Sequence, residues 1–230
     1  MPKIFYDGCE MKYASYPNVV GFTTNTTIMR QSGQLNYASF YNKHRDLVAG
    51  RPLSFQTFSD DATELKDQSR LISSIGPNLY VKIPVITSTG LSNMDTIVEL
   101  LQEGVQVNIT AVFTTQQLDM IANKLPLDVK TPAIVSVFGG RISDTGVYPK
   151  DVIQYAVTTF KPHANVEILW AGCKDNLVLQ QADEVGCHIV TLPDAIISRI
   201  NRIGQSLDNL SQDTVVSFLK DAKEGNLTIM

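Results

Sequence analysis

One lysine, Lys82, lies inside the short apolar run Leu79–Pro84, near the point where a β-strand would end. Burial at that point would lower the pKa of the lysine, because a desolvated site disfavours the charged ammonium. The neutral amine could then attack a carbonyl carbon and form a Schiff base. The simpler alternative is a lysine whose stem follows the strand while its ammonium reaches water. The other polar residues of the chain bear on this choice.

A Schiff-base reaction also needs a proton carrier and hydrogen-bonding partners for the substrate hydroxyls. Asp7 ends an otherwise apolar strand, where desolvation would raise its pKa into the range of a general acid or base. A surface acid or a helix cap is the alternative for Asp7. Gln56 could hold a water or a hydroxyl with its neutral amide, or be a satisfied core amide. Asn108 and Thr110 alternate along their strand, so both face the same side.

Two glycine-containing segments, Gly139–Arg141 and Gly172–Lys174, each carry a cation. Flexible backbone with exposed N–H groups beside a cation suits an anionic group, most often phosphate. Arg141 and Lys174 are therefore candidates for a phosphate site, although a loop with a solvated cation is the simpler explanation of either segment alone. The polar strip Thr23–Thr27 could bind a hydroxylated ligand or form a turn with capping threonines.

Short β-branched runs alternate with amphipathic stretches along the chain, which predicts βα units and a parallel sheet. The expected strands are Lys3–Asp7, Val19–Thr23, Leu53–Thr57, Leu79–Pro84, Val105–Thr110, Ala133–Phe138, Val166–Trp170 and His188–Leu192. The expected helices are Asn36–Val48, Thr63–Ser74, Leu91–Glu103, Thr115–Lys124, Pro149–Phe160, Asn176–Val185, Asp194–Ile203 and Gln212–Lys223, with at most a short helical turn at Thr26–Gln31.

Eight such units in one undivided chain of 230 residues predict a (β/α)8 TIM barrel. A doubly wound open sheet is the alternative, but the Gly-x-Gly-x-x-Gly turn that would favour a dinucleotide-binding sheet is absent. Catalytic side chains of such barrels lie at the carboxyl ends of the strands. The first seven expected strands each bring a polar residue to that rim: Asp7, Thr23 with Asn25, Gln56, Lys82, Asn108 with Thr110, Ser136, and Lys174 just after the seventh.

The composition excludes several classes of function. A formal net charge of −4 and the lack of a Lys/Arg block argue against a nucleic-acid partner. No apolar run approaches the ~18 residues of a membrane span, and Asp7 follows the first residues too soon for a signal peptide. Three cysteines without a Cys-x-x-Cys spacing indicate reduced thiols, and hence a cytoplasmic protein. The three histidines are far apart, so we expect no metal site.

Taken together, these segments resemble the small transaldolase and fructose-6-phosphate aldolase family. The matching runs follow the family's order over most of the chain: Phe5–Asp7, Gly21–Asn25, Val81–Pro84 with Gly90–Leu91, Asn108–Phe113, Phe138–Arg141 and Thr191–Pro193. The resemblance implies a barrel enzyme of carbohydrate metabolism, such as the pentose phosphate pathway, that needs no metal or organic cofactor. It also implies a ring-shaped homo-oligomer, a pentamer or decamer. Residues 1–230 would form one barrel domain, with a helical extension from about residue 205 packing on a neighbouring subunit.

The resemblance further implies catalytic roles. Lys82 would form the imine with a ketose carbonyl, and Asp7 would move the proton that lets the C3–C4 bond break. Gln56 lies at the position where transaldolases have a glutamate. Asn108 and Thr110 would help to hold the substrate and a catalytic water.

The same resemblance implies a substrate site. Asn25 and Ser136 would bind hydroxyls of a dihydroxyacetone unit, beside Thr23 and Phe138. The remaining candidates, Arg141 and Lys174, would hold the distal phosphate of a sugar phosphate or a related anionic sugar.

Several positions depart from the family pattern. Gln56 is the choice of the fructose-6-phosphate aldolases, whereas Phe138 and Asn108 are the choices of the transaldolases. Gly172 replaces a phosphate-binding serine, and Trp170 replaces a small residue, so both bear on which acceptor the chain uses.

Four functions remain open. The first is a transaldolase-like enzyme that transfers the dihydroxyacetone unit, and its alternative is an aldolase-like lyase that releases dihydroxyacetone. The third is a barrel that binds a sugar phosphate without turning it over, which the departures beside the phosphate site motivate. The fourth is an isomerase that uses Asp7 as its base, with Lys82 only as a nearby charge.

Overall fold

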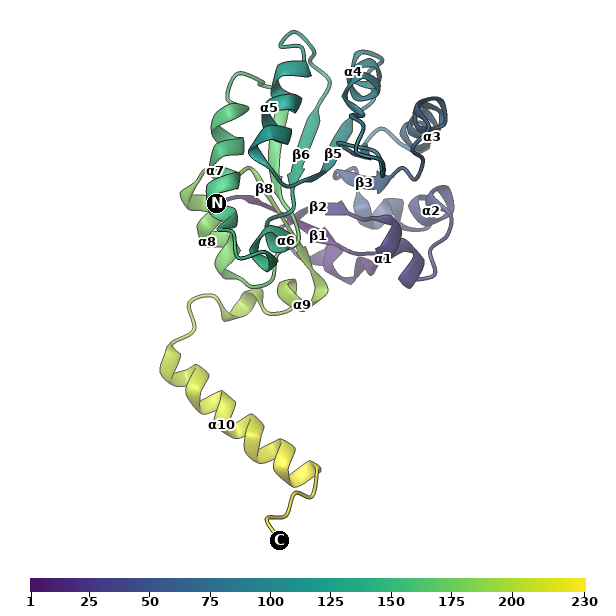
Figure 1. The fold of residues 1–230 in the computed structure, drawn as a ribbon. Coiled ribbons are helices and arrows are strands. Elements are labelled where there is room, and N and C mark those ends of the chain that lie inside the picture. The colour runs from purple at the N-terminus through teal and green to yellow at the C-terminus, as the bar shows by residue number, and fades with distance from the viewer. The chain divides into compact units, whose positions relative to one another are not determined.

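The computed structural model describes residues 1–230. Eight parallel strands close into a barrel in the order in which they follow one another along the chain, with helices on the outside (Figure 1), which confirms the predicted (β/α)8 fold. The strands are β1 (Lys3–Asp7), β2 (Val19–Thr23), β3 (Leu53–Gln56), β4 (Leu79–Pro84), β5 (Val107–Val112), β6 (Ala133–Val137), β7 (Val166–Trp170) and β8 (Ile189–Pro193).

Ten α-helices and two short 3-10 segments complete the chain. The helices are α1 (Thr26–Gln31), α2 (Tyr37–Val48), α3 (Ala62–Ile75), α4 (Met94–Gln102), α5 (Thr115–Lys124), α6 (Gly139–Asp144), α7 (Pro149–Thr159), α8 (Leu177–Glu184), α9 (Asp194–Ile197) and α10 (Leu207–Glu224). Capping side chains mark the first residues of several of these helices. Asp61 accepts hydrogen bonds from the first backbone N–H groups of α3, and Thr114 forms a capping box with Gln117 at the start of α5.

The interior of the barrel is apolar over its lower part and polar at the carboxyl ends of the strands. Its apolar part is a cluster of buried side chains: Phe5, Tyr80, Ile134, Leu169, Ala171 and Ile189. Because side chains alternate along a strand, residues two positions further on return to the interior at the upper rim. Pairing between strands brings Gln56, Lys82 and Asn108 to one level, since Gln56 pairs with Lys82 and Lys82 pairs with Asn108.

The structure differs from the predicted elements at a few boundaries. The expected helix Asp194–Ile203 is wrong, because the chain forms only the short α9 followed by a 3-10 turn at Ile200–Arg202. The expected loop that begins with Gly139 is instead the start of α6. The fifth strand lies two residues further along than predicted, at Val107–Val112.

The chain divides into two compact units, Met1–Ile197 with the barrel and Ser198–Met230 with α10. α10 is 18 residues long and has no buried residue. Its apolar side chains are exposed: Leu207, Leu210, Val215, Val216, Phe218 and Leu219. None of the helices combines the length and the hydropathy that a membrane crossing would require.

Candidate active site

Lys82 lies on β4 inside the barrel and is only 4% exposed, so its ammonium does not reach bulk water. Its Nζ donates a hydrogen bond to the backbone carbonyl of Thr24 at 3.2 Å and lies 5.7 Å from the centre of the Phe138 ring. Burial lowers the pKa of Lys82, and the charge of Asp7 opposes that shift. The site therefore favours the neutral amine more than water does, which is the form that attacks a carbonyl carbon.

Asp7 ends β1 and faces the same interior. The hydroxyl of Thr23 donates a hydrogen bond to Asp7 Oδ1 at 2.7 Å. Burial raises the pKa of Asp7, while the charge of Lys82 and the hydrogen bond from Thr23 act against that rise. The two groups thus stabilise each other's charged forms, and desolvation favours the neutral form of both. A pair balanced in this way can exchange protons with a substrate.

Asn108 lies on β5 between two hydroxyls, both of them buried. Its amide nitrogen donates to Ser54 Oγ at 3.1 Å, and its amide oxygen accepts from Ser136 Oγ at 2.7 Å. This chain of three side chains crosses from β3 to β6 on the floor of the site. The structure thus brings the predicted Asn108 and Ser136 together and adds Ser54, which the sequence analysis missed.

Thr110, two positions after Asn108, is 2% exposed, and its hydroxyl has no hydrogen-bond partner. A buried hydroxyl without a partner costs on the order of 1–3 kcal/mol, so such an atom marks a place for a ligand or a water. The next residue, Ala111, has φ +57°, and the pairing of β5 with β6 shifts its register there. The strand end that carries Thr110 is therefore irregular, as is frequent beside functional sites.

Gln56 ends β3 beside Lys82 and is partly exposed. Its backbone carbonyl accepts a hydrogen bond from the Tyr37 hydroxyl at 2.8 Å. The residue lines a hollow of about 300 Å³ together with residues of the neighbouring loops: Thr26, Thr57, Phe58, Ser59, Asp60 and Pro84. Gln56 is thus beside Lys82 in the strand register and also borders this hollow, which Lys82 itself does not line.

Asn25 and Phe138 follow the carboxyl ends of β2 and β6. Asn25 caps α1, because its side-chain oxygen accepts from the backbone N–H of Ile28 at 2.9 Å. Its amide N–H groups remain available to a ligand. Phe138 lies between two cations, with Lys82 Nζ and Arg141 Cζ each 5.7 Å from its ring centre. It also contacts the ring of Phe113, whose centre is 5.6 Å away.

Arg141 and Lys174, the predicted phosphate ligands, both have exposed side chains near the carboxyl ends of β6 and β7. Lys174 forms an ion pair with Asp144 of α6, so part of its charge is already compensated. The guanidinium of Arg141 lies over the ring of Phe138. Arg141 is thus the better placed of the two to meet an anion above the barrel interior.

The backbones of the two glycine-containing segments touch. Gly140 N–H donates to the carbonyl of Ala171 at 3.3 Å, and a Cβ atom on Gly140 would lie 1.6 Å from the carbonyl oxygen of Gly172. Gly172 itself has φ +71°, a conformation that favours glycine. Gly172 thus has a backbone reason of its own, since this loop adopts a left-handed turn against Gly140.

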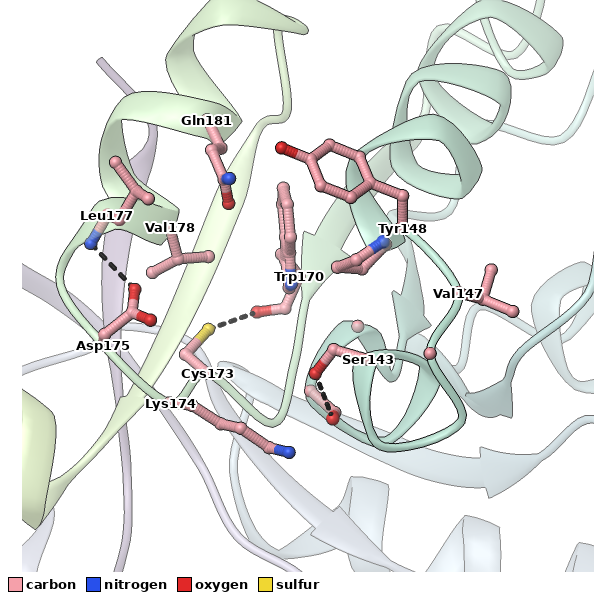
Figure 2. A pocket seen from close by; sticks show the side chains of 14 residues that line it. Ser143, Val147, Tyr148, Trp170, Cys173, Lys174, Asp175, Leu177, Val178 and Gln181 are labelled. Carbon is pink, nitrogen blue, oxygen red and sulfur yellow. Dashed lines mark hydrogen bonds between the residues drawn. The ribbon is translucent and has the colours of Figure 1, made fainter.

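Trp170 points away from the barrel interior, because its neighbours Leu169 and Ala171 on either side belong to the interior cluster. Figure 2 shows its indole between Tyr148 and the side chains of α8, in a pocket of about 330 Å³ on the outside of β7. The ring packs between helices, outside the interior that holds Lys82, and an effect of its bulk on the choice of acceptor stays a prediction.

Three groups of the site were missed by the sequence analysis: the Ser54 hydroxyl, the Thr24 carbonyl and the Thr191 hydroxyl, which lies 2.6 Å from Thr23 Oγ1. Alternation could have found Ser54, which precedes Gln56 by two positions on the same strand face. No sequence signal marks a backbone carbonyl such as that of Thr24. No group of three His, Cys, Asp or Glu side chains gathers in a way that could hold a metal ion.

The fold and the site together define a (β/α)8 barrel with a desolvated amine–carboxylate centre suited to carbonyl chemistry. Residues 4–228 match the model of the family Transaldolase/Fructose-6-phosphate aldolase, and the chain belongs to this family. Membership supports a transaldolase-like aldolase function, that of an aldolase or transferase enzyme.

Named relatives are similar to this chain over nearly their whole length. A protein named "Probable transaldolase" from Heliobacterium modesticaldum is 29% identical over 214 residues, which cover 92% of each chain. Another protein of that name, from Dehalococcoides mccartyi, is 30% identical over 206 residues, or 89% of this chain and 88% of the relative. A third, from Nitrosopumilus maritimus, is 28% identical over 226 residues, covering 95% and 94%.

Replacing both buried charges by neutral groups, as Lys82→Met together with Asp7→Asn, is expected to stabilise the folded protein by about 1–3 kcal/mol at neutral pH, because neither charge is fully solvated in the barrel. Urea unfolding measures this change. Lys82→Met alone leaves the carboxylate without its cation and should be less stable than the double variant.

The pH dependence provides the control for this comparison. Burial favours the protonated form of Asp7, so the stability that Lys82→Met lacks should return as the pH falls through the raised pKa of this group. A double variant less stable than the wild-type protein would contradict the view that the charged pair is costly.

Proposed function

We propose that this protein is a transaldolase-like enzyme that cleaves or transfers the dihydroxyacetone unit of a ketose phosphate through a Schiff base on Lys82. The observation that carries the proposal is the buried Lys82 at the carboxyl end of the barrel, with the half-buried carboxylate of Asp7 acting on its charge. A site that only binds a sugar has no need of a desolvated amine. The non-catalytic barrel and the isomerase, in which Lys82 would be only a nearby charge, are therefore less well supported.

The chemistry can be followed bond by bond. The neutral amine of Lys82 attacks the ketose C2 carbonyl, and uptake of one proton from water with loss of the hydroxyl as water gives the protonated imine. Asp7 accepts the proton of the C4 hydroxyl while the C3–C4 bond breaks. The electron pair of that bond passes to the protonated imine, which becomes an enamine. The distal part of the sugar leaves as an aldehyde. No metal or organic cofactor enters any of these steps.

The enamine then has two fates. In transfer it attacks an acceptor aldehyde, Asp7 returns the proton to the new hydroxyl, and water releases the lengthened ketose. In release it is protonated at C3, and hydrolysis frees dihydroxyacetone. Phe138 and Asn108 are the transaldolase choices of the family, and Gln56 is the aldolase choice. Two positions against one favour transfer, with dihydroxyacetone release as the second candidate.

Neighbouring groups have matching roles in this proposal. The chain of Asn108 and Ser136, with the amide N–H groups of Asn25, would hold hydroxyls of the three-carbon unit. The unpartnered hydroxyl of Thr110 and the amide of Gln56 would hold the water that forms and hydrolyses the imine. Arg141, with Lys174 as a weaker second cation, would hold the distal phosphate.

We further propose that the enzyme works in the cytoplasm as a homo-oligomer, a pentamer or decamer, in sugar-phosphate metabolism such as the pentose phosphate pathway. The oligomer is supported by α10, whose large apolar side chains are all exposed. Apolar surface of this kind usually marks an interface.

Incubation with fructose 6-phosphate or dihydroxyacetone and borohydride should add the mass of the reduced three-carbon unit to the intact protein. Lys82→Met should form no such adduct and should lose more than roughly 10³-fold in turnover, because the amine is the nucleophile. Mass spectrometry is the measurement, with Lys174→Met as the matched lysine control that retains the adduct. Full turnover by Lys82→Met would end the Schiff-base proposal.

Arg141→Ala should raise KM for a phosphorylated ketose by roughly 10- to 100-fold, the value of a charge-assisted hydrogen bond, and leave KM for dihydroxyacetone nearly unchanged. Lys174→Ala should have the smaller effect, because Asp144 already pairs with its ammonium. An unchanged KM in Arg141→Ala would remove the phosphate assignment.

Phe218→Glu on α10 should lower the mass of the particle measured by light scattering, because a charge on the apolar face opposes its burial between subunits. Asn209→Glu on the opposite side of the same helix adds the same charge at an exposed polar position and should leave the mass unchanged. A wild-type chain that is monomeric at assay concentration would contradict the proposed oligomer.

A further inference from the structure

Three oxygen atoms from three neighbouring strands lie in a row at the upper end of the barrel. Thr23 Oγ1 on β2 lies 2.7 Å from Asp7 Oδ1 on β1 and 2.6 Å from Thr191 Oγ1 on β8. Thr23 and Thr191 are 1% and 2% exposed, so neither hydroxyl can exchange its partner for bulk water. The three groups therefore depend on one another for their hydrogen bonds.

A count of protons fixes the direction of this row. Each hydroxyl carries one proton, and an ionised carboxylate carries none. Thr23 donates its hydrogen bond to Asp7. The hydrogen bond between the two threonines must therefore be donated by Thr191 and accepted by Thr23. The hydrogen bonds thus run from Thr191 to Thr23 to Asp7.

We propose that Thr191 is a positioning residue, whose hydroxyl keeps Thr23 turned toward Asp7 and reverses together with it when Asp7 takes up a proton. This inference rests on the proposed function, in which Asp7 is the base. In the reversed arrangement the Asp7 carboxyl donates to Thr23, and Thr23 donates to Thr191. Only the C–O bonds rotate: each threonine keeps its own proton, and the proton on Asp7 comes from the substrate hydroxyl. Both protonation states of Asp7 are then hydrogen-bonded without movement of the heavier atoms.

The other titratable groups that act on Asp7 are Lys82 on β4, Cys9 after β1 and Cys173 after β7. Burial raises the pKa of both thiols, so they stay neutral in the neutral pH range. Lys82 favours the ionised Asp7 by its charge, and Thr23 favours it by its hydrogen bond. Thr191 acts only on the hydrogen bond that Thr23 donates. Its effect on Asp7 can therefore be separated from the effect of the Lys82 charge.

The test is the pH dependence of kcat/KM in Thr191→Val, a substitution that keeps the shape of the side chain and removes its proton. A weaker bond from Thr23 raises the pKa of Asp7, and the ionised carboxylate is the active base. The acid limb should therefore move to higher pH, by roughly 0.2–0.5 unit. Thr23→Val removes the direct bond and should move the limb further, by about 1 unit. Thr191→Ser restores the hydroxyl and should bring the limb back.

A double variant tests whether Thr191 acts through Thr23. In the Thr23→Val background, Thr191→Val should shift the limb no further, because the link it would weaken is already absent. Thr96→Val on α4 removes a buried hydroxyl remote from the site and is the matched control. An equal shift in both backgrounds, or a loss of stability without any shift, would overturn the proposal.

Direct titration of Asp7 separates this inference from the proposed function. Carbon-13 NMR of labelled aspartate carboxyls, with Asp7→Asn to identify the signal, reports the ionisation of Asp7 without turnover. A wild-type protein that forms no borohydride-trapped adduct would defeat the proposed function, while a raised Asp7 midpoint in Thr191→Val would still support the hydroxyl row. An unchanged midpoint would overturn the row alone. If Thr191→Val does not fold, Thr191→Ala takes its place.

Discussion

The buried pair of Lys82 and Asp7 is the constraint on which the rest of the site depends. Each group loses hydration inside the barrel, and desolvation moves the pKa of both toward the neutral form. Each charge is also a counter-charge for the other, so neither can be removed without leaving the other unpaired. The free energy that this arrangement costs must come from the apolar interior below it, where side chains such as Phe5, Tyr80 and Leu169 are packed.

The closed parallel barrel supplies the geometry that the pair requires. Strand register brings Gln56, Lys82 and Asn108 to one level, and the first and last strands bring Asp7 and Thr191 together although 184 positions separate them in the chain. Polar groups at that level hydrogen-bond to one another across strands, which fixes their rotamers before a substrate arrives. Such preorganisation is the main contribution a protein makes to a reaction of this type.

The departures from the family pattern divide into two kinds once the structure is considered. Gly172 has a conformational reason, because its left-handed backbone lies against Gly140. Trp170 has a packing reason, because its ring lies outside the barrel interior. Gln56 and Phe138 are different, since both border Lys82. The choice between transfer and release is therefore expected to depend on these two side chains.

The sequence by itself determined the fold, because β-branched runs and amphipathic stretches alternate with the periods of strands and helices. It also determined the candidate centre, since a lysine and an aspartate inside apolar runs stand out against any ordinary surface pattern. It misjudged Asp194–Ile203 and the start of α6, where local propensity gives way to tertiary contacts. Only the tertiary structure decided which hydroxyls serve Asp7 and Asn108, because those partners come from other strands. A hydrogen bond between distant residues leaves no trace in local periodicity, and the direction of Trp170 or the turn at Gly172 is likewise fixed by packing.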